Sequence, residues 1–326
     1  MEKGMIIVAL APARVPPGGL EKLRAAADGR DVRLTKNKAE AEEFLDNIEI
    51  GIGDVPFSLL SRMPRLKWIQ LWSAGADWLQ NHPEVKALPF RLTTTSGMHG
   101  AQMTEHLFAM LLAWNRRLDK AFAARARREW LRIGAGLSIL GGKTMLILGY
   151  GSIGRCIAKA APAFGMKVIG IRRQAGARAA FGPAGEDAAV APVSALSEHL
   201  PAADIVVNIL PLTPETFRFF GKEQFAAMKR TALYCNIGRG ATTDEAALVG
   251  ALKEKMIAGA LLDVTETEPL PQDSPLWDMD NVLITGHYAG LHPDYDTIAL
   301  ETALDNLGRY VRNEPLRNLV DKTIGY

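Results

Sequence analysis

The chain has 326 residues, of which 48% are hydrophobic, and its 38 Lys and Arg residues against 36 Asp and Glu residues give a formal net charge of +2. This length suits two domains of ordinary size, and the apolar content excludes disorder along the whole chain. The near balance of charge argues against nucleic acid or an anionic membrane surface as a partner. No apolar run approaches the roughly 18 residues of a membrane span, so we expect a soluble, cytoplasmic protein. The two cysteines, Cys156 and Cys235, lie in apolar segments and form no metal-ligand pair, which fits a reducing compartment and predicts no metal site.

Apolar runs alternate with alanine-rich amphipathic segments from the start of the chain. The first hundred residues contain five predicted strands, "MIIVAL", "DVRLT", "IEIGIG", "LKWIQLW" and "FRLTTT". The first run superficially resembles the apolar part of a secretory signal, but it is short and suits a buried first strand better. Five strands separated by helical segments predict a smaller α/β domain.

The longest helical pattern covers residues 101–132, where apolar positions recur at helical spacing before the segment becomes basic. We interpret the basic run as a solvated face. Six further strands follow residue 140, "TMLILG", "KVIGI", "DIVVNIL", "ALYCNI", "AGALLDV" and "NVLIT". Residues 175–192 are rich in small residues and are predicted to form a surface loop, and a last helix is predicted near 294–313. Continuous apolar strands separated by helices indicate an α/β fold with doubly wound parallel sheets, in two Rossmann-like domains.

The segment "LGYGSIG" places a glycine fingerprint between a strand and a helix. Gly149 would permit the tight turn, Gly151 would let the main chain approach a pyrophosphate, and Gly154 would allow close packing of the helix on the strand. The amides near Ser152 and Ile153 would then point at the phosphates from the helix N-terminus. Because the required strand and helix both flank the motif, it predicts a dinucleotide-binding site.

The strand "KVIGIRRQ" ends in two arginines where an NAD-binding unit has an acidic residue. Arg172 lies 18 residues beyond Gly154, close to the offset of about 20 residues at which the ribose-binding acid is expected. A guanidinium has donors only, so it cannot accept hydrogen bonds from ribose hydroxyls, but it can bind a 2′-phosphate. Arg172 and Arg173 therefore favour NADP over NAD, although a pair of surface arginines at a strand end remains an alternative.

Three segments of the second half carry a polar residue at or after a strand end: "NIGRG" with Arg239, "DVTETEPLP" with Glu268 and "TGHYAG" with His287. In this order and with this spacing, the chain closely resembles the D-isomer-specific 2-hydroxyacid dehydrogenases. The resemblance extends to "LKWIQLWSAGAD", "TSGMHGAQMTEHLFAMLL" and "DIVVNILPLTPET", so it covers nearly the whole chain.

The resemblance implies a role for each of the three residues. His287 would give a proton to the carbonyl oxygen of a 2-oxo acid during reduction and take it back in the reverse reaction. Glu268 would hydrogen-bond the imidazole, fix its tautomer and favour its protonated form. Arg239 would bind the substrate carboxylate and polarise the carbonyl, a task that suits a permanently charged fork of donors.

The resemblance also assigns the first domain. Its loop at Ser73, Ala74 and Gly75 would present backbone amides to the substrate carboxylate. The implied substrate-binding domain is discontinuous, at residues 1–102 and 291–326, with a dinucleotide-binding domain inserted at 103–290. A homodimer through the 101–132 region is implied as well. Further coenzyme contacts are implied for Pro211, Ile237 and Asp263.

Three positions depart from the pattern of the resembled family. Gly286 replaces a usual proline beside His287, Tyr288 replaces a smaller residue, and Thr95 replaces a common asparagine. None of these changes removes a catalytic group, so they affect the expected substrate and leave the expected reaction unchanged.

The interpretation that fits these features is an NADPH-preferring reductase of a small 2-oxo acid, of the glyoxylate or hydroxypyruvate type. The first alternative is an NAD-dependent dehydrogenase of a D-2-hydroxy acid such as lactate or phosphoglycerate, against which the two arginines count. The second alternative is a dinucleotide-sensing corepressor, because such proteins can keep the same three residues.

Overall fold

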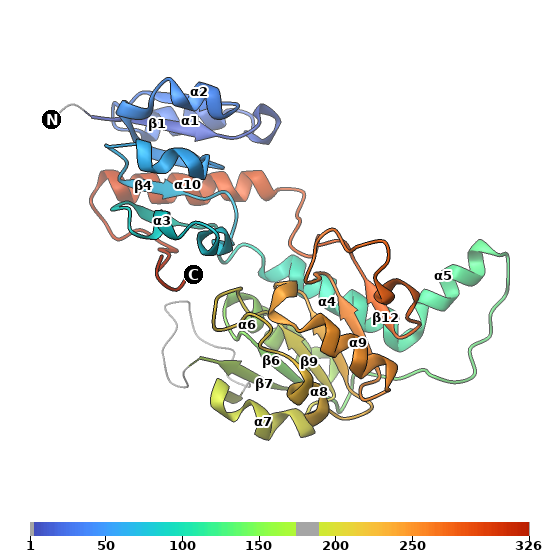
Figure 1. Cartoon of the computed structure of the whole chain (residues 1–326). Coiled ribbons are helices and arrows are strands. Elements are labelled where there is room, and N and C mark those ends of the chain that lie inside the picture. Colours follow the sequence, from blue (N-terminus) through green and yellow to red (C-terminus); the bar gives the residue numbers. More distant parts are fainter. Residues whose placement is uncertain (1–2, 174–188, 326) are drawn as a thin grey trace. The chain divides into compact units, whose positions relative to one another are not determined.

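The structure is a computed structural model that describes residues 3–173 and 189–325. The chain forms two compact units (Figure 1): unit 1 comprises Met1–Met98 and His292–Tyr326, and unit 2 comprises His99–Leu291. Each unit is built on its own sheet, and all of the paired strands named in either sheet run parallel. The predicted α/β class with two doubly wound parallel sheets is confirmed.

The sheet of unit 1 has five strands in the order β2-β1-β3-β4-β5. All five strands predicted from the apolar runs are present, and the predicted last helix is α10. The order places β1 and β3 at the centre, where the chain reverses its direction across the sheet. The strands are β1 (Met5–Ala9), β2 (Val32–Thr35), β3 (Ile48–Gly53), β4 (Trp68–Gln70) and β5 (Arg91–Thr93). The helices are α1 (Gly19–Ala26), α2 (Lys38–Glu42), α3 (Pro83–Lys86) and α10 (Tyr295–Val311).

The sheet of unit 2 has seven strands in the order β12-β11-β10-β9-β6-β7-β8. The chain moves outward from β6 through β7 to β8, then returns to β9 and continues outward on the other side, so β6 and β9 form the switch point. The strands are β6 (Thr144–Leu148), β7 (Lys167–Arg172), β8 (Ala189–Pro192), β9 (Ile205–Asn208), β10 (Leu233–Asn236), β11 (Gly259–Leu262) and β12 (Val282–Ile284). The helices are α4 (Gly100–Arg116), α5 (Leu118–Ala126), α6 (Ser152–Ala160), α7 (Leu196–His199), α8 (Lys222–Ala227) and α9 (Glu245–Lys253).

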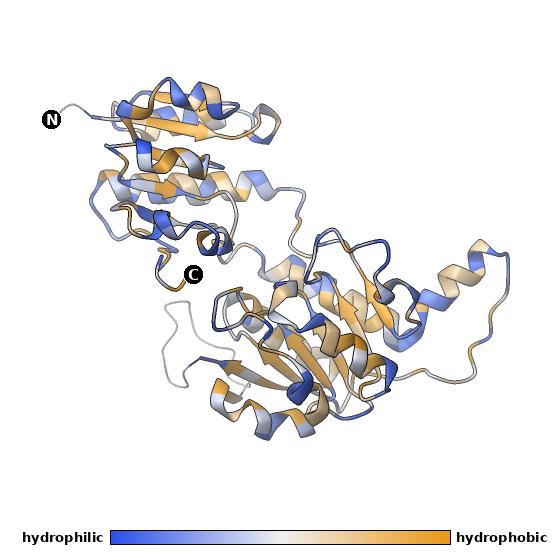
Figure 2. Ribbon diagram, in the orientation of Figure 1, coloured by the Kyte–Doolittle hydropathy of each residue, from blue (hydrophilic) through white to orange (hydrophobic). Residues whose placement is uncertain are grey.

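The strands of unit 2 are apolar on both faces, as expected for a parallel sheet between two layers of helices. Met145 and Ile147 of β6 belong to a core shared with α4 and α6, while Leu146 and Leu148 of the same strand belong to a core shared with α8 and α9. Figure 2 shows the strands of both units as mainly hydrophobic. Burial on both faces leaves the loops at the strand ends to carry polar side chains.

Two sequence predictions about unit 2 are wrong in part. The expected helix at 101–132 is two helices, because Arg117 adopts a left-handed backbone (φ 54°) between α4 and α5, and α5 ends at Ala126. Arginine and leucine are both good helix formers, so residues 116–118 contain no signal for a break. The expected loop at 175–192 ends in strand β8, whose edge position tolerates Pro192. Residues 174–188 of that predicted loop lie outside the described residues.

Candidate active site

The candidate residues of unit 2 lie at or just beyond the carboxyl ends of its strands. The glycine motif follows β6, the two arginines end β7, and Pro211 follows β9. Arg239 follows β10, and the segments that carry Glu268 and His287 follow β11 and β12. In a parallel sheet these ends share one edge, which is where ligands of doubly wound folds bind. The sequence motifs thus converge on one edge of one sheet.

The glycine motif forms a turn that is tightly packed at its first and last glycines. Gly149 has a φ of 89°, and a Cβ there would lie 2.6 Å from the carbonyl oxygen of Ile209. A Cβ on Gly154 would lie 3.1 Å from the carbonyl oxygen of Gly149. Helix α6 starts at Ser152, and no described side chain caps this helix start. Its first backbone N–H groups and the positive end of the helix dipole are suited to bind a phosphate.

The two arginines occupy different surroundings at the end of β7. Arg172 is half-buried and is the last residue of the strand. Arg173 is exposed, and its Nη2 lies 3.6 Å from Oε2 of Glu215. Glu215 belongs to the turn that begins at Pro211, and Thr216 closes this turn by donating to the Pro211 carbonyl at 2.6 Å. The turn after β9 and the end of β7 therefore meet beside the expected ribose position.

A buried polar network supports the loop that carries Arg239. The Nδ2 of Asn236 donates to the Arg239 carbonyl at 3.2 Å and to Thr243 Oγ1 at 2.9 Å. Tyr234 OH lies 2.7 Å from the same Thr243 oxygen, and Asn208 donates to Tyr234 OH at 2.8 Å. These four side chains are almost fully buried, whereas Arg239 is half-buried. The network holds the Arg239 backbone from the side of the strands, and the guanidinium lies beyond the strand end.

Close packing adds to this support. A Cβ on Gly240 would lie 1.8 Å from the carbonyl oxygen of Thr265, so only glycine fits beside Arg239 at this contact. The Arg239 loop therefore packs directly on the segment that leads to Glu268. His99 lies near the same guanidinium. Burial lowers the pKa of His99, and the charge of Arg239 lowers it further, so the neutral imidazole is favoured here.

Glu268 and His287 form a close pair. Oε2 of Glu268 lies 2.6 Å from Nδ1 of His287, and Oε1 of the same carboxylate accepts a hydrogen bond from the Thr265 amide at 3.2 Å. The side chains are 48% exposed for His287 and 35% exposed for Glu268, so both can exchange protons with solvent. This geometry leaves Nε2 as the imidazole nitrogen that faces away from Glu268.

Asp263 holds the backbone around His287. Its buried carboxylate accepts hydrogen bonds from the Tyr288 amide at 3.1 Å, the Ala289 amide at 3.0 Å and the Thr285 hydroxyl at 2.6 Å. Its carbonyl oxygen accepts from the His287 amide at 2.7 Å. His287 has a left-handed backbone (φ 56°), a conformation uncommon for residues other than glycine. Asp263 therefore stabilises the strained segment that presents the imidazole.

Two further side chains meet at this segment. His106 of α4 lies 3.0 Å from Thr285 Oγ1, and its ring packs edge-on against that of Tyr288 at 5.2 Å between centroids. Gly286 has open space around it, because a Cβ added there would meet no atom within 4 Å. Tyr288, which sequence analysis singled out as a departure, is therefore oriented by α4.

Unit 1 contains the other predicted loop, at residues 73–75. Ser73 Oγ donates to the carbonyl of Gly75 at 3.2 Å, and Thr95 donates to the Ser73 carbonyl through its amide at 3.0 Å. Trp72 is only 1% exposed and donates to Asp296 at 2.7 Å, so it belongs to the core of unit 1. The loop itself begins beyond the carboxyl end of β4, the edge at which ligands bind in this fold class.

Sequence analysis missed the residues that support the site from beneath. Asn208, Tyr234, Thr243 and Thr285 make the contacts above, but each reads in the sequence as part of an apolar strand or a polar loop. A polar residue closing an apolar strand, as Asn208 and Asn236 do, is the signal that could have found two of the network residues.

Comparison with known proteins agrees with this arrangement. Residues 108–289 match the model described as D-isomer specific 2-hydroxyacid dehydrogenase, NAD binding domain. The chain belongs to the D-isomer-specific 2-hydroxyacid dehydrogenase family. A glyoxylate reductase of Aeropyrum pernix is 34% identical over 82% of this chain and 79% of its own length. Glyoxylate/hydroxypyruvate reductase B of Escherichia fergusonii is 35% identical over 88% of this chain and 86% of its own length.

Solved structures of the 2-hydroxyacid dehydrogenase family are also similar. A family member from Xanthobacter autotrophicus Py2, in complex with NADPH and MES, is 29% identical with a TM-score of 0.81, over 100% of both chains. An NADPH-dependent glyoxylate/hydroxypyruvate reductase of Sinorhizobium meliloti, in complex with NADP and sulfate, is 29% identical with a TM-score of 0.79, over 99% of this chain and 100% of that one. As a member of this family of oxidoreductases, the chain carries a nicotinamide-dinucleotide-binding domain.

Two features are absent from the part of the chain that the structure describes. No described helix combines the length and the apolar character needed to cross a membrane. Within the same residues, no group of three or more His, Cys, Asp and Glu side chains could hold a metal ion.

Proposed function

We propose that this protein reduces a small 2-oxo acid of the glyoxylate or hydroxypyruvate type to the D-2-hydroxy acid, with NADPH as the coenzyme. The observation that carries the proposal is the Glu268–His287 pair, with 2.6 Å between Oε2 and Nδ1. This pair shares the carboxyl edge of the unit 2 sheet with Arg239 and with the glycine turn. A proton donor, an anion-binding cation and a phosphate-binding turn are the groups that such a reduction needs.

His287 would act as the acid. With Nδ1 engaged by Glu268, the proton leaves from Nε2 toward the carbonyl oxygen of the substrate as the oxygen gains charge, and the same nitrogen takes it back in the reverse direction. Because one Glu268 oxygen is held by the Thr265 amide at 3.2 Å, the carboxylate is fixed while it orients the imidazole. The positive charge on the imidazolium is then balanced within the pair.

Arg239 would bind the substrate. Its guanidinium offers up to five N–H donors and a positive charge, so it can pair with a carboxylate and polarise the adjacent carbonyl. The buried network under its backbone keeps the charge in place before substrate arrives, which lowers the reorganisation needed during the reaction. The backbone at residues 73–75 of unit 1 is proposed to contribute amides to the substrate carboxylate.

The residues of unit 2 fit a dinucleotide coenzyme. A Cβ at Gly149 or Gly154 would fill the turn before α6, where the uncapped helix start suits a pyrophosphate. We propose that Pro211, Ile237 and Asp263 complete the coenzyme site, the last through its hold on the 285–289 segment. When bound, the reduced nicotinamide supplies the hydride.

The coenzyme preference rests on Arg172 and Arg173. Two arginines at the end of β7 provide charge for a 2′-phosphate and no acceptor for ribose hydroxyls. Structures of similar proteins in complex with NADPH or NADP support this preference.

The test is a matrix of NADPH and NADH against glyoxylate, hydroxypyruvate, pyruvate and phenylpyruvate, with kcat/KM measured for each pair. We expect the highest kcat/KM with NADPH and either glyoxylate or hydroxypyruvate. Equal or better efficiency with NADH would overturn the coenzyme assignment and favour an NAD-dependent dehydrogenase. No turnover with any of the eight pairs would reject the proposed reaction.

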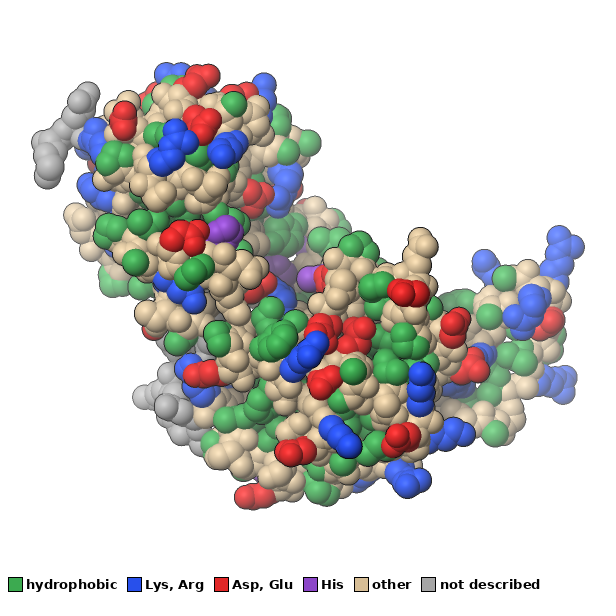
Figure 3. Space-filling view, viewed as in Figure 1, with side chains coloured by type: hydrophobic (Ala, Val, Ile, Leu, Met, Phe, Trp, Pro, Cys, Tyr) green, Lys and Arg blue, Asp and Glu red, His purple; other side chains and the backbone are tan. Residues whose placement is uncertain are grey.

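We also propose that two copies of the chain associate through α5 and the segment that follows it. The exposed apolar side chains in this region include Phe122 at 67%, Trp130 at 91% and Ile139 at 68% exposure. Figure 3 shows Lys and Arg side chains gathered over the same part of unit 2. A second copy of the chain that covers these large apolar side chains would remove them from water. Light scattering coupled to size exclusion should give a dimer, and a monomer at micromolar concentration would contradict the proposal.

A further inference from the structure

The C-terminal segment of unit 1 lies along β5 and the residues that follow it. The Val320 amide donates to the Leu92 carbonyl at 2.8 Å, and Leu319 forms an antiparallel bridge with Thr93. The Thr94 amide donates to the Asn318 carbonyl at 3.2 Å. The chain thus returns from α10 to cover the edge of the sheet at β5 and at Thr94, the residue that follows this strand.

Asn318 makes the contacts that reach beyond the strand. Its side-chain Nδ2 donates to the carbonyl of Thr94 at 3.2 Å and to the carbonyl of Ser96 at 2.7 Å. Both amide hydrogens are used, and the two acceptors are two residues apart, so the contacts fix the bend of the chain at residues 94–96. The backbone turns into Gly97, with a φ of 101°, directly after this point.

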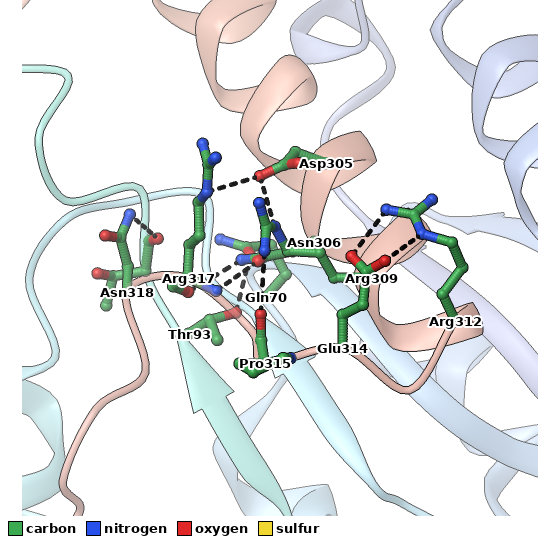
Figure 4. A network of polar contacts seen from close by, with 11 residues as sticks. Gln70, Thr93, Asp305, Asn306, Arg309, Arg312, Glu314, Pro315, Arg317 and Asn318 are labelled. Atoms are coloured by element: carbon green, nitrogen blue, oxygen red, sulfur yellow. Dashed lines mark hydrogen bonds and ion pairs between the residues drawn. The ribbon is translucent and has the colours of Figure 1, made fainter.

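Asn318 is itself held by a buried network (Figure 4). Asn306 of α10 accepts from the Arg317 amide at 2.8 Å and donates to the Arg317 carbonyl at 3.1 Å. Its Nδ2 also donates to Gln70 at 2.8 Å, and Gln70 accepts from Thr93 at 2.7 Å. Asn306, Gln70 and Thr93 are fully buried. A fully satisfied buried network of this kind rigidifies the backbone around it, here the residue before Asn318.

Residues 94–96 connect Asn318 to the predicted substrate loop at residues 73–75. The Thr95 amide donates to the Ser73 carbonyl at 3.0 Å, and its hydroxyl donates to the Trp72 carbonyl at 3.1 Å. Residues 94–96 therefore lie between Asn318 on one side and the start of the 73–75 loop on the other. A change in their backbone alters the positions of the amides at 73–75.

We propose that Asn318 is a positioning residue for substrate binding: it sets the backbone of residues 94–96 and, through Thr95, that of the 73–75 loop. It does not touch the substrate. The inference rests on the proposed function, because it takes the 73–75 amides as ligands of the substrate carboxylate. Removal of the Asn318 amide is expected to weaken substrate binding in the ground state and the transition state alike, and so to raise KM more than it lowers kcat.

The main variant is Asn318→Gly. Asn318 has a left-handed backbone (φ 53°), which glycine adopts without strain, so this change removes the amide and little else. Asn318→Asp is the second variant, because it keeps the shape while replacing the donor with an acceptor that faces two carbonyls. The matched control is Asn313→Gly: Asn313 has φ 55° and is exposed, and its side chain has no hydrogen bond to any described residue.

Initial rates with glyoxylate as the varied substrate and saturating NADPH give KM and kcat, and NADPH titrations give the coenzyme Kd. Both Asn318 variants should raise the KM for glyoxylate by about three- to tenfold, because each loses one or two hydrogen bonds. The value of kcat should change less than about twofold. The NADPH Kd should stay constant, and Asn313→Gly should match the wild type in all three values.

The outcomes separate the two proposals. If the wild type turns over glyoxylate and both Asn318 variants keep its KM, the positioning role is wrong and the proposed function stands. If both variants lose kcat and KM is unchanged, Asn318 acts on something other than substrate binding and the inference is also wrong. If the wild type turns over none of the 2-oxo acids, the proposed function fails and the inference fails with it.

Discussion

Buried polar side chains gather at opposite strand ends in two regions of this molecule. In unit 2, the network of Asn208, Tyr234, Asn236 and Thr243 lies at the carboxyl ends of β9 and β10, directly under Arg239. In unit 1, the buried carboxylate of Glu49 lies near the amino end of β3. Ligands of parallel sheets bind beyond the carboxyl ends. The comparison indicates that polar groups at one end shape the site, whereas those at the other end serve stability alone.

The Glu49 cluster shows what the amino end contains. Its carboxylate accepts from Tyr310 OH at 2.7 Å, from the Gly4 amide at 2.8 Å and from Arg30 at 3.2 Å. Burial alone would raise the pKa of Glu49, but these hydrogen bonds and the charge of Arg30 outweigh it and lower the pKa to about 2. The cluster ties α10 and the start of β1 to the sheet. It contains no residue of the candidate site.

The largest expected effect on activity comes from a residue at the carboxyl edge of the unit 2 sheet. His287→Ala removes the proposed proton donor, and kcat should fall by about 10³-fold, within the range found for loss of a general acid. Steady-state kinetics with glyoxylate and NADPH would measure it. The matched control is His199→Ala, in helix α7 before β9, which should keep full activity. Near-normal turnover of the His287 variant would remove the mechanism.

Arg239→Ala should be the next most damaging change. Loss of the charged donors should lower kcat/KM by about 10²- to 10³-fold, comparable to the loss of a donor that stabilises developing charge on a carbonyl oxygen. The coenzyme Kd should change little. Arg230→Ala, an exposed arginine just before β10, is the control and should have no effect. Equal losses in the two variants would point to a general effect of charge, and not to a site at the carboxyl end.

In contrast to the His287 and Arg239 variants, Glu49→Gln should keep normal kinetics and lower the stability of the fold. The pKa of Glu49 is lowered from 4.5 to about 2 in the folded state, so its contribution of about 3 kcal/mol is complete above pH 4.5 and is lost as pH falls toward 2. Urea unfolding between pH 7 and pH 3 should show a larger loss of stability in the wild type than in the variant, because other carboxylates of the chain contribute equally to both. Glu43→Gln, at an exposed position of the same unit, is the control. A kinetic defect in the Glu49 variant would break the comparison.

The smallest effects are expected from two matched tyrosine changes, one at each of the two strand ends. Tyr234→Phe removes a hydroxyl from the network under Arg239, while Tyr310→Phe removes one from the Glu49 cluster. Each should lower the free energy of unfolding by about 1 to 2 kcal/mol. Only Tyr234→Phe should also lower kcat/KM, by about two- to fivefold, because it loosens the loop that holds the guanidinium. Equal kinetic behaviour of the two variants would argue against a division between strand ends.

The sequence predicted the strands well and the supporting contacts poorly. Eleven apolar runs became strands because a parallel strand buried on both faces needs continuous apolar residues, a local signal. Strand β8 was missed because at the sheet edge it is short and only partly buried. The break at Arg117 was missed because a left-handed arginine has no sequence signal.

The motif residues were recognisable for a different reason. Glu268 and His287 lie in segments whose order and spacing match the family, so their pairing was expected before the 2.6 Å contact was known. Asn318 and Asn306 lie in no such motif. Asn318 contacts Thr94 and Ser96, and Asn306 contacts Gln70, and each of these partners lies more than 200 residues away in the chain. Contacts between residues so distant in sequence leave no periodic pattern that a single sequence can display.

The discontinuity of unit 1 has a consequence for synthesis on the ribosome. Helix α10, which supplies Leu300, Ala303 and Leu307 to the unit 1 core, belongs to the segment made after all of unit 2. Domains usually fold in the order in which they emerge, but here residues 1–98 must wait for the part of their core that α10 supplies. We expect a chain that stops at residue 291 to yield a protease-resistant unit 2 and protease-sensitive residues 1–98. Residues 1–98 of unit 1 would thus be exposed to chaperones and proteases for the whole time that unit 2 is being translated.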